Sequence, residues 1–269
     1  MSYFIAWLEP TKGASTFWKI LRPLLAIDLT LVAVYLLLEV ARVLGVIESS
    51  ALTRLMAVPA DRTIPEFFQY FKWLSIVSCL AICGRHADSR CLLCFTLVFL
   101  ILLLDDAASI HERGGELLVG LLSLQPALGL RAQDIGELIS WLALGVVVVA
   151  SVVFGLRHAE GDDKSGAHRL CVALAALVAV GVGVDMAHII VVEAMPQGWP
   201  RGAINLAFNV AEDGGEMLLA SYAVAVAAAM VTTARRRRVG EVLSGFYPAS
   251  ELAEASLRQD LRGTPPSSP

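Results

Sequence analysis

Six long apolar stretches make up most of the chain, and they constrain what it can fold into. Each reaches about the length of 20 residues that an α-helix needs to cross a bilayer. The composition agrees, because 57% of the residues are hydrophobic, only 17% are charged and the mean hydropathy is +0.67. We therefore predict an all-α, polytopic integral membrane protein. Its six transmembrane helices are expected at about 18–46, 66–84, 91–118, 136–156, 170–194 and 203–234.

Basic residues mark one side of the predicted membrane. They precede the first span, separate the second from the third and the fourth from the fifth, and follow the sixth: Lys12, Lys19, Arg22, Arg85, Arg90, Arg157, Lys164, Arg169 and Arg235 to Arg238. The positive-inside rule then predicts cytoplasmic termini in a bacterial-type inner (plasma) membrane. Residues 1–234 are expected to form the six-helix transmembrane domain. Residues 235–269 are expected to form a basic and partly disordered cytoplasmic tail.

Two stretches one hundred residues apart carry the same polar pattern. The first, DDAASIHERGGELL, begins at Asp105, and the second, NLAFNVAEDGGEML, begins at Asn205. Offsets of 0, 4, 7 and 11 fall on one side of an α-helix. At these offsets the two stretches hold Asp105, Ser109, Glu112 and Glu116, and Asn205, Asn209, Glu212 and Glu216. Because the two helices run in opposite directions, the pattern indicates an inverted three-plus-three repeat, with local convergence as the alternative.

Acidic residues collect at one depth of the predicted membrane. Counting about 1.5 Å per residue from the basic boundary places Asp105 and Asp185 roughly 22–24 Å across, in the outer third. The same count brings further acids to this layer: Glu39, Asp106, Glu112, Glu116, Glu137, Glu193, Glu212, Asp213 and Glu216. Fewer basic groups accompany them: Arg42, Lys72, Arg113, His111 and His188. Acids that are neither paired nor solvated must share protons or hold a cation.

The types of side chain in this layer predict a metal site. Asp185 and His188 lie one turn apart, and together with acids from facing helices they resemble the ligand supply of dimetal sites in helical bundles. Those bundles supply the acid-x-x-His motif twice, whereas this chain has it once. The predicted ligands are Asp105, Glu112, Glu116, Asp185, His188, Glu212 and Glu216. Mixed oxygen and nitrogen ligands favour Fe, Mn or Zn, and an all-oxygen subset would suit Ca²⁺ or Mg²⁺.

Other residues flank the predicted ligands. His111, Asp106 and Asp213 are candidate catalytic groups that transfer protons. A supporting role is predicted for Glu39, Asn205, Asn209, Arg113 and Lys72. No organic cofactor is predicted. Two alternatives stay open, namely a metal-free proton or ligand site and a structural ion-pair network in which Asp106 pairs with Arg113 and Glu39 pairs with Arg42.

The inner halves of the predicted spans are almost wholly apolar, with Asp28 as the main exception. This asymmetry favours a pocket that opens outward over a path through the membrane. We therefore expect a membrane-embedded, metal-dependent oxidoreductase or hydrolase that acts on a lipid or another amphiphile. A divalent-cation or proton-coupled transporter is the alternative, and a structural subunit of a membrane complex is the third reading. Membrane lipid is the expected partner, nucleic-acid binding has no support, and the sequence does not give the oligomeric state.

Four cysteines surround the connection between the second and third spans: Cys79, Cys83, Cys91 and Cys94. Their predicted compartment is reducing, so a structural disulfide is not expected there. Their spacing matches no zinc-ribbon pattern. We expect them to pack as small apolar side chains.

Overall fold

The computed structural model describes residues 13–48, 51–60, 62–127, 129–196 and 198–246, with only the backbone given for 162, 193 and 236–246. In these parts of the chain all the regular elements are helices. Six of them are long and apolar enough to cross a membrane: Ala14–Val43, Ile64–His86, Arg90–Ala108, Ala132–Arg157, Asp163–Val192 and Trp199–Arg235. The prediction of an all-helical protein with six helices of membrane-spanning length is confirmed. The predicted tail residues 247–269 lie outside the described residues.

The first half of the bundle contains α2 (Ala14–Val43), the short α3 (Ala51–Leu55), α4 (Ile64–His86) and α5 (Arg90–Ala108). Sequence signals fix where α4 begins. The Thr63 hydroxyl accepts a hydrogen bond from the Glu66 backbone N–H, and Pro65 lies in the first turn, where its missing N–H costs nothing. Ser89 caps α5 in the same way, through the Leu92 N–H.

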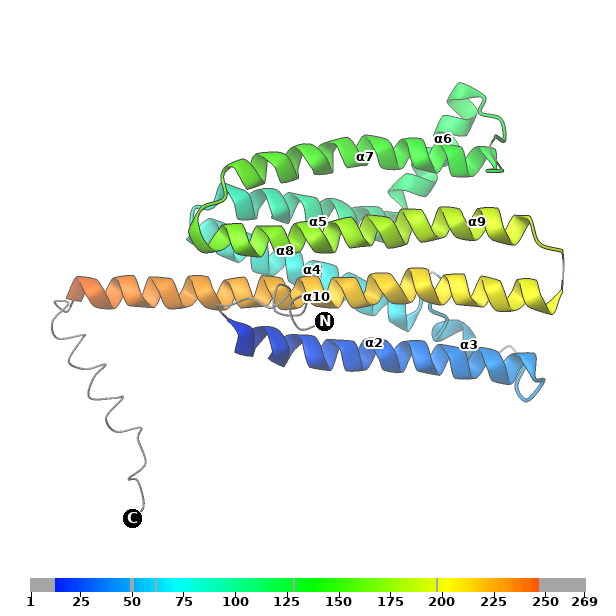
Figure 1. Cartoon of the computed structure of the whole chain (residues 1–269), viewed down its shortest axis with the longest axis horizontal. Helices are drawn as coiled ribbons and strands as arrows, with labels where there is room; N and C mark the ends of the chain where they lie inside the picture. Colours follow the sequence, from blue (N-terminus) through cyan, green and yellow to red (C-terminus); the bar gives the residue numbers. More distant parts are fainter. Residues whose placement is uncertain (1–12, 49–50, 61, 128, 197, 247–269) are drawn as a thin grey trace, which may run out of the picture.

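The predicted straight helix over 91–118 is wrong in one respect, because it is broken at Ser109. This residue adopts the left-handed conformation, with φ 46° and ψ 50°, and it ends α5 and precedes α6 (Ile110–Leu122). Few residues other than glycine adopt this conformation easily, so the break redirects the chain at a definite point. Figure 1 shows α6 leaning away from the direction of α5.

The second half contains α7 (Ala132–Arg157) and then α8 (Gly161–Val178), which continues through a π-helix, η1 (Ala179–Val184), into α9 (Asp185–Glu193). The last helix, α10 (Trp199–Phe246), has 48 residues and continues past the predicted end of the sixth span at residue 234. Successive long helices run in opposite directions, as Figure 1 shows.

The helices pack in a pattern that centres on α10. This helix lies against α2, α4, α8, η1 and α9, while α5 lies against α4, α7 and α8. A large apolar core fills one half of the bundle, and its fully buried members include Phe17, Ile76, Leu80, Phe95, Phe99 and Leu170. Cys83 and Cys91 are buried in this core, and both are free thiols, in agreement with a packing role.

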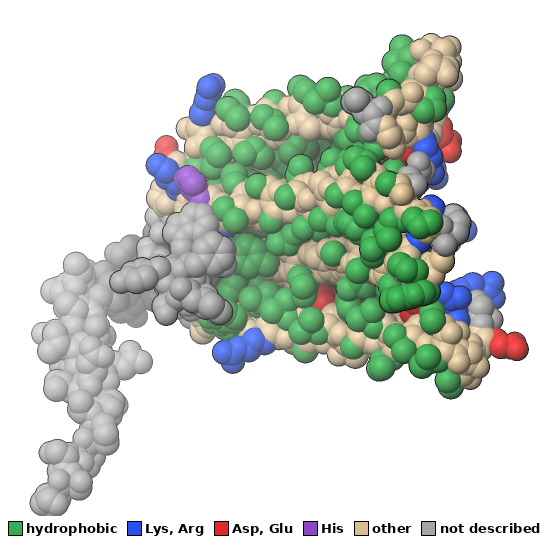
Figure 2. All heavy atoms as spheres, turned by 45° about the vertical axis from the view of Figure 1, so that its right-hand side comes forward, with side chains coloured by type: hydrophobic (Ala, Val, Ile, Leu, Met, Phe, Trp, Pro, Cys, Tyr) green, Lys and Arg blue, Asp and Glu red, His purple; other side chains and the backbone are tan. Residues whose placement is uncertain are grey.

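The surface separates apolar from charged side chains. On the face drawn in Figure 2, hydrophobic side chains cover the middle of the bundle, while basic and acidic side chains gather mainly at its ends. Leucine and valine side chains also stand exposed along α2 and α7, for example Leu37 at 69% and Val149 at 61%. Such a belt is typical of helices that face lipid.

Candidate metal centre

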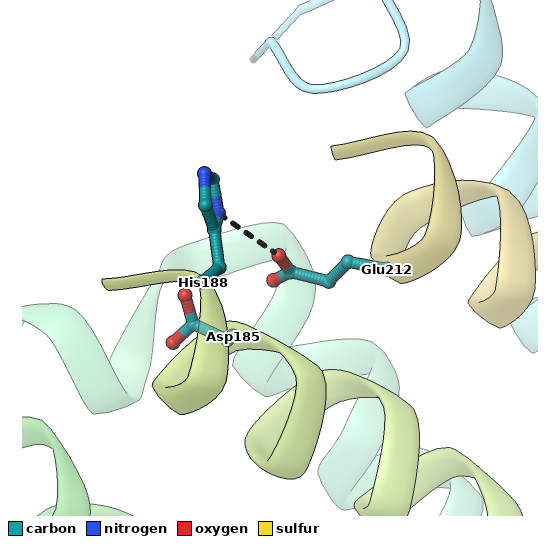
Figure 3. A group of neighbouring side chains, drawn as sticks. All are labelled: Asp185, His188 and Glu212. Carbon is teal, nitrogen blue, oxygen red and sulfur yellow. Dashed lines mark ion pairs between the residues drawn. The ribbon is translucent and has the colours of Figure 1, made fainter. Parts of the chain in front are cut away.

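Three side chains with metal-ligand chemistry meet between α9 and α10. Asp185 and His188 lie one turn apart on α9, and Glu212 extends toward them from α10 (Figure 3). One ligand atom from each residue lies within 4.8 Å of the other two. All three side chains are half-buried. The group joins two carboxylates and one imidazole, a donor set that suits a first-row transition metal or zinc.

The ring of His188 is held in a defined orientation. Its Nε2 lies 2.9 Å from the Asn205 Oδ1, which can only accept, so Nε2 carries the hydrogen and donates it. The other ring nitrogen, Nδ1, lies 3.9 Å from the Glu212 Oε2. The ring also stacks on Phe208, with ring centroids 5.1 Å apart. A histidine held from behind by an amide, with its second nitrogen facing acids, is the usual arrangement of a metal ligand.

The π-helix η1 precedes Asp185 directly and shapes the wall beside it. A Cβ atom at Gly181 would lie 2.2 Å from the Glu216 Oε1. Because glycine has no side chain, there is room for this carboxylate beside η1. A Cβ atom at Gly215 of α10 would lie 3.0 Å from the Val180 Cγ1 of η1. Single turns of π-helix occur often at functional sites, because they change which residues face inward.

Two further acids from the predictions lie near this group. Glu216 is repelled electrostatically by Asp213 and Asp185, and Glu212 is repelled by Asp185, Asp213 and Glu216. The predicted catalytic residue Asp106 also repels Glu216 and Asp213. Its own Oδ2 accepts a hydrogen bond of 2.9 Å from the Trp73 indole N–H. The expected pair between Asp106 and Arg113 is therefore replaced by a contact to α4, because the break at Ser109 separates the two residues.

His111 and Asp105 form a second histidine–carboxylate pair. The Asp105 Oδ2 lies 2.9 Å from the His111 Nδ1, and Oδ1 accepts a 2.9 Å hydrogen bond from the His111 backbone N–H. The imidazole also lies 5.1 Å from the ring of Trp141, centroid to centroid. Burial opposes protonation of His111, but the hydrogen bond and charge of Asp105 outweigh it, so the pKa of His111 is raised above its ordinary value.

The group in Figure 3 does not include the other predicted residues of the first stretch, Glu112, Arg113 and Glu116. All three are exposed on α6. The Gly pair of this stretch faces α7 instead: a Cβ at Gly114 would lie 2.3 Å from the Ser140 Oγ, and one at Gly115 would lie 2.8 Å from the Glu137 backbone N. The corresponding residues of α10, Glu212 and Glu216, are half-buried. The two stretches match in sequence but differ in environment.

Lys72 was expected beside the acidic layer, and its partner is a different acid. Its ammonium donates to the Asp28 Oδ1 at 3.0 Å and to the Met217 carbonyl at 2.8 Å. The Ser221 hydroxyl donates to the Asp28 Oδ2 at 2.5 Å. Lys72, Asp28 and Ser221 are all 0% exposed. This buried network joins α2, α4 and α10, and Lys72 therefore holds helices together without neutralising the acids near Glu212.

One supporting residue, Glu39, makes the contact that local spacing predicted, and a second, Asn209, was assigned no partner. Glu39 accepts from the Arg42 guanidinium, one turn away on α2. Asn209 forms a hydrogen bond with the side chain of Tyr35. No motif or spacing singles out Gln69 or Trp73 in the sequence, although both lie on the buried face of α4. In the sequence, the two glycines of AVGVGV are the feature that indicates an irregular helix before Asp185.

A family model described as a domain of unknown function, DUF8692, matches residues 24–233. The chain belongs to this family. The part that matches DUF8692 includes Asp185, His188 and Glu212, and also the buried network around Lys72. No curated protein matches the chain, and neither does any solved structure.

Proposed function

We propose that Asp185, His188 and Glu212 bind a divalent metal ion in a membrane-embedded enzyme. The observation that carries this proposal is the group itself, two carboxylates and an oriented imidazole with ligand atoms within 4.8 Å of one another. Among the described residues, the ion pairs formed by arginine and lysine do not include the three residues of this group. Arg42, Lys72 and Arg131 pair instead with Glu39, Asp28 and Asp134, respectively. A cation is the simplest way to balance acids in such a place.

The number of ligands supports a catalytic role over a structural one. Structural metal sites are usually closed by four protein ligands, whereas catalytic sites have three and leave a position for water or substrate. Fe, Mn or Zn suits the two oxygens and one nitrogen. A metal held in this way activates bound water or oxygen. Candidate groups for the accompanying proton transfers are His111, Asp106 and Asp213.

The expected substrate is a lipid or another amphiphile, because the bundle is surrounded by apolar side chains and the acids lie in its outer half. On this proposal the protein sits in a bacterial-type inner membrane with both termini in the cytoplasm. The basic ends and connections support that orientation. Glu112, Glu116 and Asp105 stay candidate ligands from the sequence pattern, and the metal content of variants separates them from the group in Figure 3.

Elemental analysis by plasma mass spectrometry of the detergent-purified full chain tests the metal site. We expect near-stoichiometric Fe, Mn or Zn in the natural protein and its loss in Asp185→Asn and in Glu212→Gln. The matched control is Glu112→Gln, the same change at the corresponding position of the first stretch, which should retain the metal. Cys91→Ser should retain it as well. Equal metal content in all these variants would overturn the proposal.

Transport is the second candidate function, and the packing of the helices favours it. The first three long helices can be exchanged in order with the last three, and most pairs of helices in contact then correspond to other pairs in contact. The pair α4 and α5 corresponds to the α8–α9 segment and α10. The pair α5 and α7 corresponds to α10 and α2. This supports the inverted repeat found in many transporters. Metal uptake into proteoliposomes that depends on Glu212 would favour transport over catalysis.

A further inference from the structure

Helix α6 does not continue the membrane crossing that α5 makes. The 19 residues of α5, from Arg90 to Ala108, extend about 28 Å, close to the ~30 Å thickness of the hydrocarbon layer. The chain has therefore crossed this layer when it reaches the break at Ser109. Figure 1 shows α6 running across the direction of the long helices. A helix with this start and this direction has no need to span the bilayer.

The contacts between α6 and α7 give the depth at which α6 lies. Gly114 lies against Ser140, and a Cβ atom at Gly136 would lie 2.5 Å from the Gly115 carbonyl oxygen. Counting about 1.5 Å per residue back from Arg157, at the basic end of α7, places Ser140 about 26 Å and Gly136 about 32 Å away. These distances correspond to the far edge of the hydrocarbon layer. The middle of α6 is therefore at the level where hydrocarbon meets the headgroups.

The exposed side chains of α6 are sorted by polarity around the helix. Ile110, Leu117 and Leu121 fall on one side, because they are seven and then four residues apart. Leu117 is 67% exposed and Leu121 is 79% exposed, so the protein itself does not cover this side. Glu112 and Glu116, one turn apart, are exposed on a different side. This division is typical of an amphipathic helix that lies in the plane of a membrane interface.

We propose that α6 is an interfacial helix, which inserts Ile110, Leu117 and Leu121 among lipid acyl chains and keeps Glu112 and Glu116 in the headgroup layer. The partner is lipid and not a second copy of the chain, because the depth and direction of α6 bring its apolar side to the edge of the apolar belt on α7. The interaction surface lies at the end of the bundle away from the basic connections. It goes beyond the proposed metal site and is independent of it.

Spin labelling of the full chain in phosphatidylcholine vesicles tests this placement. Leu121→Cys and Glu116→Cys each receive a nitroxide label. Its collisions with oxygen, which concentrates in lipid, are compared with its collisions with a water-soluble nickel complex. We expect the oxygen-to-nickel collision ratio to be several-fold higher for Leu121→Cys than for Glu116→Cys. Both natural side chains are exposed, so the changes leave the packing intact. The natural chain, treated in the same way, gives the background from its own cysteines.

Leu117→Cys provides a second variant, which tests the direction of the helix. In a helix parallel to the membrane, labels at positions 117 and 121 have the same depth and give equal ratios. A helix that continued the direction of α5 would place position 121 about 6 Å farther along the crossing, and unequal ratios would therefore overturn the proposal. Frequent nickel collisions at both positions would show that water covers this side. Few collisions with either reagent would show that protein covers it, and each of these results contradicts the assignment to lipid.

Discussion

The conformation of a single serine decides which side chains the first acidic stretch presents. Ser109 takes a left-handed conformation, and the next helix therefore begins with His111 turned back onto Asp105. In a continuous helix, Asp105 would have shared a face with Glu112. Periodicity cannot predict this break, because serine is compatible with a helix and the apolar pattern continues through it. By contrast, the one-turn spacing of Asp185 and His188 was read correctly, since their helix is regular from Asp185 onward.

The pair of Asp105 and His111 predicts a pH dependence of stability. The folded-state pKa of His111 is raised above its ordinary value of 6.5. Protonated His111 therefore stabilises the fold at low pH, and this contribution is lost as the pH rises from about 6.5 through the higher folded-state value. The thermal midpoint of the natural protein, minus that of His111→Gln, should decrease as the pH rises above about 6.5. Parallel curves for the two proteins would contradict this.

At the scale of elements, the π-helix is the feature that periodicity misses most completely. An apolar pattern shows that residues 170–194 form a helix, but it does not show where the winding changes. The change at Ala179–Val184 places Gly181 against Glu216, and it alters which side of α9 carries Asp185 and His188. The six long helices were predictable because membrane spans need only length and apolarity.

Two glycines of the π-helix supply a matched test of its role. Gly181→Ala would place a Cβ where the Glu216 Oε1 lies, whereas a Cβ at Gly183 has no atom within 4 Å. Because Oε1 is the end of a flexible side chain, Gly181→Ala should change the thermal midpoint little. It should nevertheless reduce the metal content found by plasma mass spectrometry, because it displaces the carboxylate of the predicted ligand Glu216. If Gly183→Ala has the same effect, the contact between Gly181 and Glu216 is not the cause.

For the whole molecule, the division into an apolar half and an acidic half follows from the sequence, but the partners of the buried charges do not. Counting residues from the predicted membrane boundary puts Lys72 at the same depth as the acids of α10. The tertiary arrangement instead brings it to Asp28, which is 44 residues away along the chain. Depth can be counted from a membrane boundary, whereas the rotation and neighbours of each helix depend on packing.

The network of Asp28, Lys72 and Ser221 should contribute strongly to stability, because it joins three helices and all three side chains are 0% exposed. Lys72→Met leaves a buried carboxylate unpaired and should lower the free energy of unfolding by about 3–5 kcal/mol. The double variant Asp28→Asn with Lys72→Met should recover most of this loss. Chemical unfolding in micelles measures both changes. The single variants Lys72→Met and Asp28→Asn each give a loss of unfolding free energy. If the loss in the double variant equals the sum of these two losses, the pair does not interact.

The positions of these groups along the chain also set an order of assembly. During synthesis Asp28 is made first, and its charge is matched once α4 supplies Lys72, 44 residues later. Ser221, 193 residues after Asp28, completes that network only when the last long helix arrives. The same helix supplies Glu212, so the group of Asp185, His188 and Glu212 cannot form before the sixth long helix has been made. A nascent chain can thus form its internal charge pair long before it can form this group.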